Sequence, residues 1–409
     1  MELTGRAAHP LSLGPPPVHL QFLEEQSRPS KHKGIGIRSL LRYGGGKRLN
    51  NRTILPFFKN NSVIPATCCA AKATTSTGAA ADDMLEVDLR EIKDKCRKWN
   101  WKGRYAINYF VSHSSSDPHS SNPNRPPILL VHGFGASILH WRRNISTLAR
   151  IHTVYAIDLV GFGGSEKPVG FSYTMEKWAE LILDFLDEIV QEPTVLIGNS
   201  VGSLACVIAA ASASASASGA EAESNNKALV RGLVLLNCAG GMNNKAITDD
   251  WRIKLFLPLL WLIDFLLKQR GIASAIFERV KQRDNIRNIL LSVYGNKESV
   301  DEELVEIIME PTCDPGALDA FVSIVSGPPG PSPVQLMPTV VSSSLPLLVL
   351  WGDEDPFTPL DGPIGKYFAS LPSQLPYVTL FVLQGVGHCP HDDRPDLVHK
   401  KLLPWLDHI

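Results

Sequence analysis

The stretch that most constrains the fold of this chain is residues 193–205, PTVLIGNSVGSLA, an apolar run followed by a small-residue turn. The run is typical of a buried strand, and the small residues after it favour the start of a helix. The turn reads Gly-x-Ser-x-Gly with Ser200 at its centre, which lifts a serine hydroxyl above the end of a parallel sheet. Gly198 and Gly202 let strand and helix pass closely. The pattern also occurs by chance, so a plain packing turn is the alternative.

Further apolar runs alternate with helical patterns, which predicts an α/β fold with a mostly parallel central sheet and helices on both faces. Thr174 is placed to cap a helix that runs to about Val190 with one apolar stripe. Trp99 and Trp101 alternate with polar residues, and we expect them on edge strands facing the core. The predicted strands after these are Ile128–Val131, Thr153–Leu159, Val230–Asn237, Leu345–Trp351 and Tyr377–Leu383.

The strand over Ile128–Val131 ends in a glycine-rich loop, His132 to Ser137. Such a loop can present backbone N–H groups to the oxyanion that forms when Ser200 attacks a carbonyl. The candidate donors are the N–H of Phe134 and the N–H of Val201, the residue after the serine. The alternative is an ordinary turn between strand and helix.

An acid and a base follow later strands. Asp355 is the preferred acid and Asp353 the reserve, because an acid just past a strand end can orient a histidine and stabilise its charged form. After the last strand, His388 is the preferred base, and His391 competes with it. The chain order Ser200, Asp355, His388 is that of the α/β-hydrolase fold, which we therefore predict for residues 85–409.

Three segments between these motifs are assigned no chemistry of their own. The glycines of residues 161–165 lack the lysine of a phosphate loop and are read as structural. The alternation of Ala and Ser over 211–218 is read as a low-complexity surface insertion.

The third segment, from about residue 241 to residue 340, is predicted to form a helical lid. Within it, Leu255 to Leu267 is shorter than the ~20 residues that span a bilayer. It is either a buried lid helix or a surface that meets a membrane or a long apolar substrate.

The N-terminal segment, residues 1–70, differs in composition from the rest. No acidic residue lies between Glu25 and Asp82, while basic and hydroxyl residues are frequent, which predicts an organelle transit peptide cut near 68–71. A retained basic tail and a mitochondrial address are the alternatives. The net charge of -1 does not suggest nucleic-acid binding, and the seven scattered cysteines favour a reducing compartment.

These motifs together resemble the plant plastid α/β-hydrolases that include pheophytinase and chlorophyll dephytylase. The resemblance covers about residues 90–409. The sequence Val201-Gly202-Ser203 is closer to chlorophyll dephytylase than to pheophytinase, in which Leu-Gly-Gly is expected at this position. It implies hydrolysis of the phytyl ester of chlorophyll, giving chlorophyllide and phytol at the thylakoid, by a triad of Ser200, Asp355 and His388. The residues that carry it are LVHGFGAS with HWR in 130–142, GFGGSEKP in 161–168, IGNS in 197–200 and GVGHCPHD in 385–392.

Other functions are weighed against this one. Haloalkane dehalogenases and epoxide hydrolases of the same fold need an aspartate at the position of Ser200. A hydrolase of plastid lipids or general acyl esters fits the sequence equally well, and a ligand receptor on a hydrolase scaffold is less compatible with a transit segment. The proposed chemistry needs no metal and no organic cofactor. The sequence does not choose among chlorophyll a, chlorophyll b and pheophytin.

Overall fold

The computed structural model describes residues 89–113, 125–217, 229–243, 265–267 and 269–409, all within one compact unit, Ala79–Ile409. The predicted transit segment, residues 1–70, lies outside the described residues. So does most of the apolar stretch from Leu255 to Leu267.

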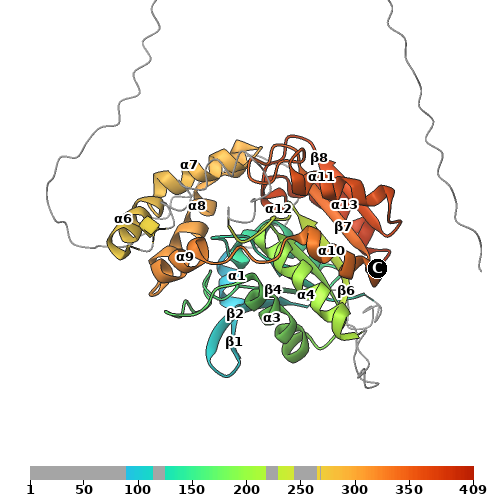
Figure 1. The fold of residues 1–409 in the computed structure, drawn as a ribbon, viewed down its shortest axis with the longest axis horizontal. Coiled ribbons are helices and arrows are strands. Elements are labelled where there is room, and N and C mark those ends of the chain that lie inside the picture. The colour runs from blue at the N-terminus through green and yellow to red at the C-terminus, as the bar shows by residue number, and fades with distance from the viewer. Residues whose placement is uncertain (1–88, 114–124, 218–228, 244–264, 268) are drawn as a thin grey trace, which may run out of the picture. The chain divides into compact units, whose positions relative to one another are not determined.

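The described residues form an eight-stranded sheet in the order β1-β2-β4-β3-β5-β6-β7-β8 (Figure 1). The pairs β1–β2 and β2–β4 are antiparallel, and the other neighbours are parallel, which confirms the predicted mostly parallel sheet. The strands are β1 (Arg97–Trp101), β2 (Tyr105–Ser112), β3 (Ile128–Val131), β4 (Val154–Ile157), β5 (Thr194–Asn199), β6 (Val230–Leu236), β7 (Leu347–Gly352) and β8 (Val378–Leu383).

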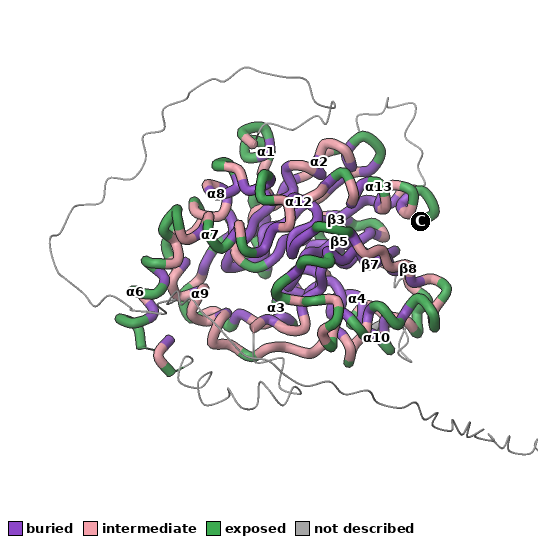
Figure 2. Tube along the Cα trace, turned by 90° about the horizontal axis from the view of Figure 1, so that it is seen from above, coloured by how far each residue is buried: buried purple, intermediate pink, exposed green. Residues whose placement is uncertain are grey.

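Helices cover both faces of this sheet, so the central strands are buried on both sides (Figure 2). Along β5, Leu196 joins the core beneath α3 and α4, whereas Val195 and Ile197 join the core beneath α2 and α13. Trp99 and Trp101 on β1 are buried, as predicted. The helices in this part are α1 (Leu89–Lys95), α2 (Arg142–Ala149), α3 (Met175–Phe185), α4 (Val201–Ala217), α11 (Pro363–Ser370), α12 (Pro390–Asp393) and α13 (Pro395–Leu406).

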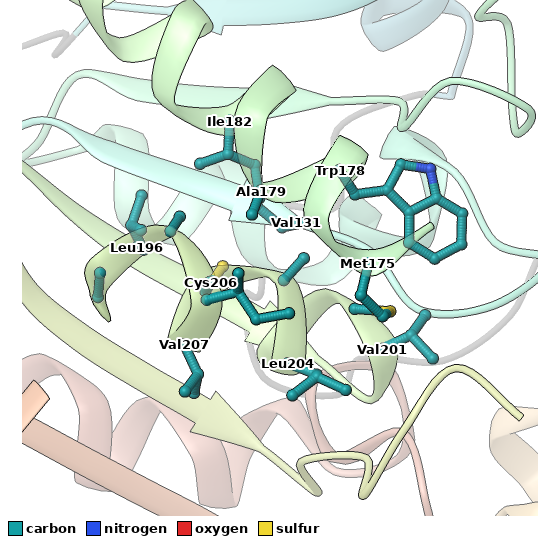
Figure 3. Close-up of a cluster of buried hydrophobic side chains, with 14 of the residues drawn as sticks. Val131, Met175, Trp178, Ala179, Ile182, Leu196, Val201, Leu204, Cys206 and Val207 are labelled. Carbon is teal, nitrogen blue, oxygen red and sulfur yellow. The ribbon is translucent and has the colours of Figure 1, made fainter. Parts of the chain in front are cut away.

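The α3 helix begins where the sequence predicts, because the Thr174 side chain accepts a hydrogen bond of 3.2 Å from the backbone N–H of Lys177. Its apolar stripe includes Trp178 and Ile182, which belong to the same buried core as Leu204 and Cys206 on α4, and the two helices are in contact (Figure 3). This packing fixes α4, and therefore the turn that carries Ser200, against the sheet.

The prediction that the Ala-Ser run is a surface insertion is wrong for its described part. The run continues α4 without a break as far as Ala217. Alanine has the highest intrinsic helix propensity, which favours this continuation. The Ser214 hydroxyl finds its partner within the helix, because it donates to the Ala210 carbonyl one turn earlier, at 2.9 Å. Residues 218–228 lie outside the described residues.

The segment between β6 and β7 is helical in its described part, as the sequence predicts. We call α6 to α9 the cap helices; in Figure 1 they lie to one side of the sheet. In the described ranges, no helix is both long enough and apolar enough to cross a membrane. The helices of this segment are α6 (Arg270–Val280), α7 (Arg283–Val293), α8 (Glu302–Met309), α9 (Ala317–Ser326) and α10 (Pro333–Ser342).

Candidate active site

The turn between β5 and α4 holds Ser200 in a left-handed backbone conformation, with φ of 55°. Such a conformation is strained for a residue with a side chain and is kept only by tight surroundings. A Cβ on Gly198 would lie 2.5 Å from the Ser203 N, and one on Gly202 would lie 2.3 Å from the His132 carbonyl oxygen. Neither position accepts a side chain without a backbone shift. The two glycines therefore let α4 start directly above the strand end.

The three residues predicted to act together are in hydrogen-bond contact. The Ser200 Oγ lies 2.8 Å from His388 Nε2, and His388 Nδ1 lies 2.7 Å from Asp355 Oδ2. An ionised carboxylate only accepts hydrogen bonds, so the imidazole carries its proton on Nδ1 and leaves Nε2 free to accept from the serine. All three side chains are largely buried.

The Asp355 carboxylate is held by donors on both oxygens. Oδ1 accepts from the backbone N–H groups of Phe357 (2.7 Å) and Thr358 (3.1 Å). Oδ2 accepts from Asn237 Nδ2 (2.7 Å) and from the Thr358 hydroxyl, in addition to His388. Burial alone would raise the pKa of Asp355, but the hydrogen bond and charge of His388 and the Thr358 donors outweigh it and hold the pKa at about 2. The acid is therefore ionised at neutral pH.

The two reserve residues have other partners. Asp353 Oδ1 accepts from the backbone N–H of Gly385 at 2.8 Å, so it supports the loop that leads to His388. The His391 ring is fully buried against Trp141, with ring centroids 4.1 Å apart. Neither of its nitrogens has a hydrogen-bond partner among the described residues. Burial lowers the pKa of His391 well below its usual value, so this ring stays neutral.

Two asparagines that the sequence reasoning missed hold the triad. Asn237 follows β6, bonds Asp355 as described above, and accepts from the Gly352 N–H at 2.9 Å. Asn199, next to the serine, donates from Nδ2 to the His388 carbonyl at 3.0 Å. The signal in the sequence is a polar residue at the end of an otherwise apolar strand.

The two predicted oxyanion donors belong to segments that border Ser200. Val201 is the first residue of α4, where backbone N–H groups have no partner within the helix and the helix dipole favours negative charge. The His132–Ser137 loop passes close to the serine, because a Cβ on Gly133 would lie 3.3 Å from the Ser200 Cβ. Asp158 holds the far end of this loop by accepting from the Ile138 N–H at 2.7 Å.

Asp158 also explains the glycines of residues 161–165. Its Oδ2 accepts from the Gly164 N–H at 2.8 Å, and a Cβ on Gly163 would lie 2.3 Å from its carboxyl carbon. These glycines therefore shape a loop around a buried carboxylate, in keeping with a structural role. Among the described residues, no group of His, Cys, Asp and Glu is arranged to hold a metal ion.

Two exposed phenylalanines flank the catalytic candidates. Phe357 is 59% exposed, and its ring stands edge-on to the His388 ring with centroids 5.1 Å apart. Phe134 is 44% exposed, and its ring lies 6.5 Å from that of Phe321 on the cap helix α9. The surroundings of the serine and histidine are therefore partly aromatic on both sides.

Comparison with known proteins shows the family to which this chain belongs. A relative from Arabidopsis thaliana, chloroplastic pheophytinase, is 25% identical over 76% of this chain and 66% of its own length, just under two thirds. The uncharacterized hydrolase YugF of Bacillus subtilis is 27% identical over 70% of this chain and 92% of its own. The solved structure of epoxide hydrolase CorEH superposes with a TM-score of 0.56 at 18% identity, covering 76% of this chain and 98% of that one. The sequence model of the alpha/beta hydrolase fold matches residues 126–395, and this chain belongs to that family.

Proposed function

We propose that this member of the hydrolase family is a serine carboxylic-ester hydrolase. The observation that carries the proposal is the continuous hydrogen-bonded chain from the Ser200 hydroxyl through His388 to the ionised Asp355. A serine in such a chain is activated as a nucleophile, because the imidazole accepts its proton as the carbonyl is attacked. A simple packing turn would not need a base and an acid aligned behind the serine.

The reaction then runs in two halves. In the first, Ser200 Oγ bonds to the ester carbonyl carbon, its proton passes to His388 Nε2, and Asp355 stabilises the resulting imidazolium. The backbone N–H groups of Phe134 and Val201 stabilise the oxyanion, each contributing about 10²–10³ in rate. His388 returns the proton to the departing alcohol. In the second half, His388 deprotonates a water that attacks the acyl-enzyme, which releases the acid and regenerates Ser200.

For the substrate we propose the phytyl ester of chlorophyll, cleaved to chlorophyllide and phytol. Two features support a large apolar ester: the likeness to a chloroplastic pheophytinase over most of the chain, and the exposed Phe134 and Phe357 beside the triad. The Val201-Gly202-Ser203 sequence supports a closer relation to chlorophyll dephytylase. The basic stretch between Glu25 and Asp82, which holds no acidic residue, supports a chloroplast address. We place the lid, residues of about 241–340, in peripheral contact with the thylakoid surface.

The test compares the full-length protein with Ser200→Ala on three esters: chlorophyll a, pheophytin a and p-nitrophenyl butyrate. We expect chlorophyllide from the wild-type protein and none above background from the variant. Hydrolysis of the short ester alone would keep Ser200 as the nucleophile and contradict the pigment substrate. If the wild-type protein turned over no ester, the hydrolase proposal would give way to a ligand-binding role.

A further inference from the structure

A buried carboxylate outside the triad joins the cap to the loop that carries His388. Asp393, at the end of α12, is 1% exposed. Its Oδ2 accepts from the backbone N–H of Gly387 at 2.6 Å and from that of Gly295 at 2.8 Å, and its Oδ1 accepts from the Asn296 N–H at 2.8 Å. One carboxylate thus binds the residue before the histidine together with two residues that follow α7.

The two segments that share this carboxylate are in direct backbone contact. His388 donates its backbone N–H to the Val293 carbonyl at 2.8 Å. A Cβ on Gly387 would lie 2.1 Å from the same carbonyl oxygen, and a Cβ on Gly295 would lie 2.3 Å from the Gly385 carbonyl oxygen. The end of α7 therefore lies against the histidine loop with no side chain between them. The position of the His388 backbone therefore depends on the groups that hold the end of α7 against this loop.

We propose that Asp393 is a positioning residue for His388, which it fixes through the Gly387 amide and the cap segment Val293–Asn296. The inference rests on the proposed function, in which His388 is the general base. Asp353 holds this loop at Gly385 and Asn199 holds it at the His388 carbonyl, and Asp393 holds the residue between them, Gly387. Hydrogen bonds to a carboxylate are short and strong. A displacement of about 1 Å at a catalytic group costs up to about 100-fold in rate.

The neighbouring acid has a different role, which makes the assignment specific. Asp392 is equally buried, but its Oδ2 accepts from the Tyr294 hydroxyl at 3.0 Å and its Oδ1 faces Arg142 Nε at 3.4 Å. Within the described part of the chain, its carboxylate accepts no hydrogen bond from the histidine loop. Of the two adjacent carboxylates on α12, Asp393 is the one bonded to that loop.

The first test measures the chemistry that needs a placed base. Wild type, Asp393→Asn and Asp393→Ala are compared in the rate of Ser200 labelling by a fluorophosphonate and in the kcat and KM for p-nitrophenyl butyrate, at a temperature where all are folded. The control is Leu402→Ala, at a buried apolar residue of α13, which lowers stability without removing a hydrogen bond to the histidine loop. We expect both Asp393 variants to lose about 10- to 100-fold in labelling rate and in kcat, with KM within about twofold of wild type.

Labelling and kcat of the Asp393 variants equal to those of Leu402→Ala would overturn the inference, because the carboxylate would then contribute stability only. If the wild-type protein itself showed no labelling at Ser200, the proposed function would be the part that fails.

A second measurement uses the wild-type protein, so it does not depend on the variants folding. In amide hydrogen exchange we expect the loop amides of Gly295, Asn296 and Gly387 to be protected about as strongly as those of β8, because they donate to a buried carboxylate. Exchange of these three amides at the rate of exposed loops would show that the contact does not persist in solution and would overturn the inference whatever the activities.

Discussion

Asp355→Asn is the substitution whose outcome the structure defines most closely. In the wild-type protein, Oδ1 of Asp355 accepts two backbone N–H groups, and Oδ2 faces His388 and the Asn237 amide. The backbone donors are fixed, so the new amide must place its oxygen at the Oδ1 position. Its NH2 group then points at His388 Nδ1 and at the Asn237 NH2.

This geometry forces the wrong histidine tautomer. His388 Nδ1 must accept from the new amide, so its proton moves to Nε2, which can no longer accept from the Ser200 hydroxyl. Loss of the correct tautomer in a serine triad costs about 10⁴ in kcat, or about 5.4 kcal/mol of transition-state stabilisation. The opposed NH2 groups of residues 355 and 237 also cost about 1–3 kcal/mol of folding free energy.

The assay separates these two effects with a matched double variant. In Asp355→Asn with Asn237→Asp, the two side chains exchange roles, so the amide of residue 355 donates to the carboxylate of residue 237. The free energy of unfolding, measured in urea, should then be close to that of the wild-type protein. The tautomer stays wrong, so kcat for p-nitrophenyl butyrate should remain about 10⁴-fold low. A single variant that keeps more than about a tenth of wild-type kcat, or a double variant that regains it, would refute this reasoning.

Two further predictions concern stability. The folded chain keeps His391 neutral because burial lowers its pKa, whereas the unfolded chain protonates it near pH 6.5, so stability falls as the pH drops below that value. Between pH 8 and pH 5 His391→Phe should therefore lose about 2 kcal/mol less unfolding free energy than wild type, and equal losses in urea titrations would contradict the assignment. Gly202→Ala places its Cβ 2.3 Å from the His132 carbonyl oxygen, and we expect it to destabilise the fold by about 1–3 kcal/mol and to lower kcat. The control Gly271→Ala, where a Cβ would meet no atom within 4 Å, should be neutral or stabilising by up to about 1 kcal/mol in the same unfolding assay.

The sequence alone determined the layers of the fold, and it predicted the chain order of the three candidate catalytic residues. Short apolar runs separated by amphipathic helices read as buried parallel strands because both features are local and periodic, and the strands over Ile128–Val131 and Tyr377–Leu383 lie close to where they were expected. The turn that carries Ser200 was predictable for the same reason, since Gly198, Ser200 and Gly202 lie within five consecutive residues. The Ala-Ser run was misread because low complexity hid a composition that favours helix.

Only the tertiary structure decided which groups meet around the histidine. Two acids and two histidines follow strand ends in the sequence. Which of them come together depends on partners from other elements, such as Asn237 for Asp355 and the Val293 carbonyl for the His388 backbone. Asn237 beside Asp355 and Asp393 beside Gly387 and Gly295 are pairings between residues far apart in the chain or on separate elements. No local pattern encodes them, because a hydrogen bond of this kind depends on where the folded backbone places both partners.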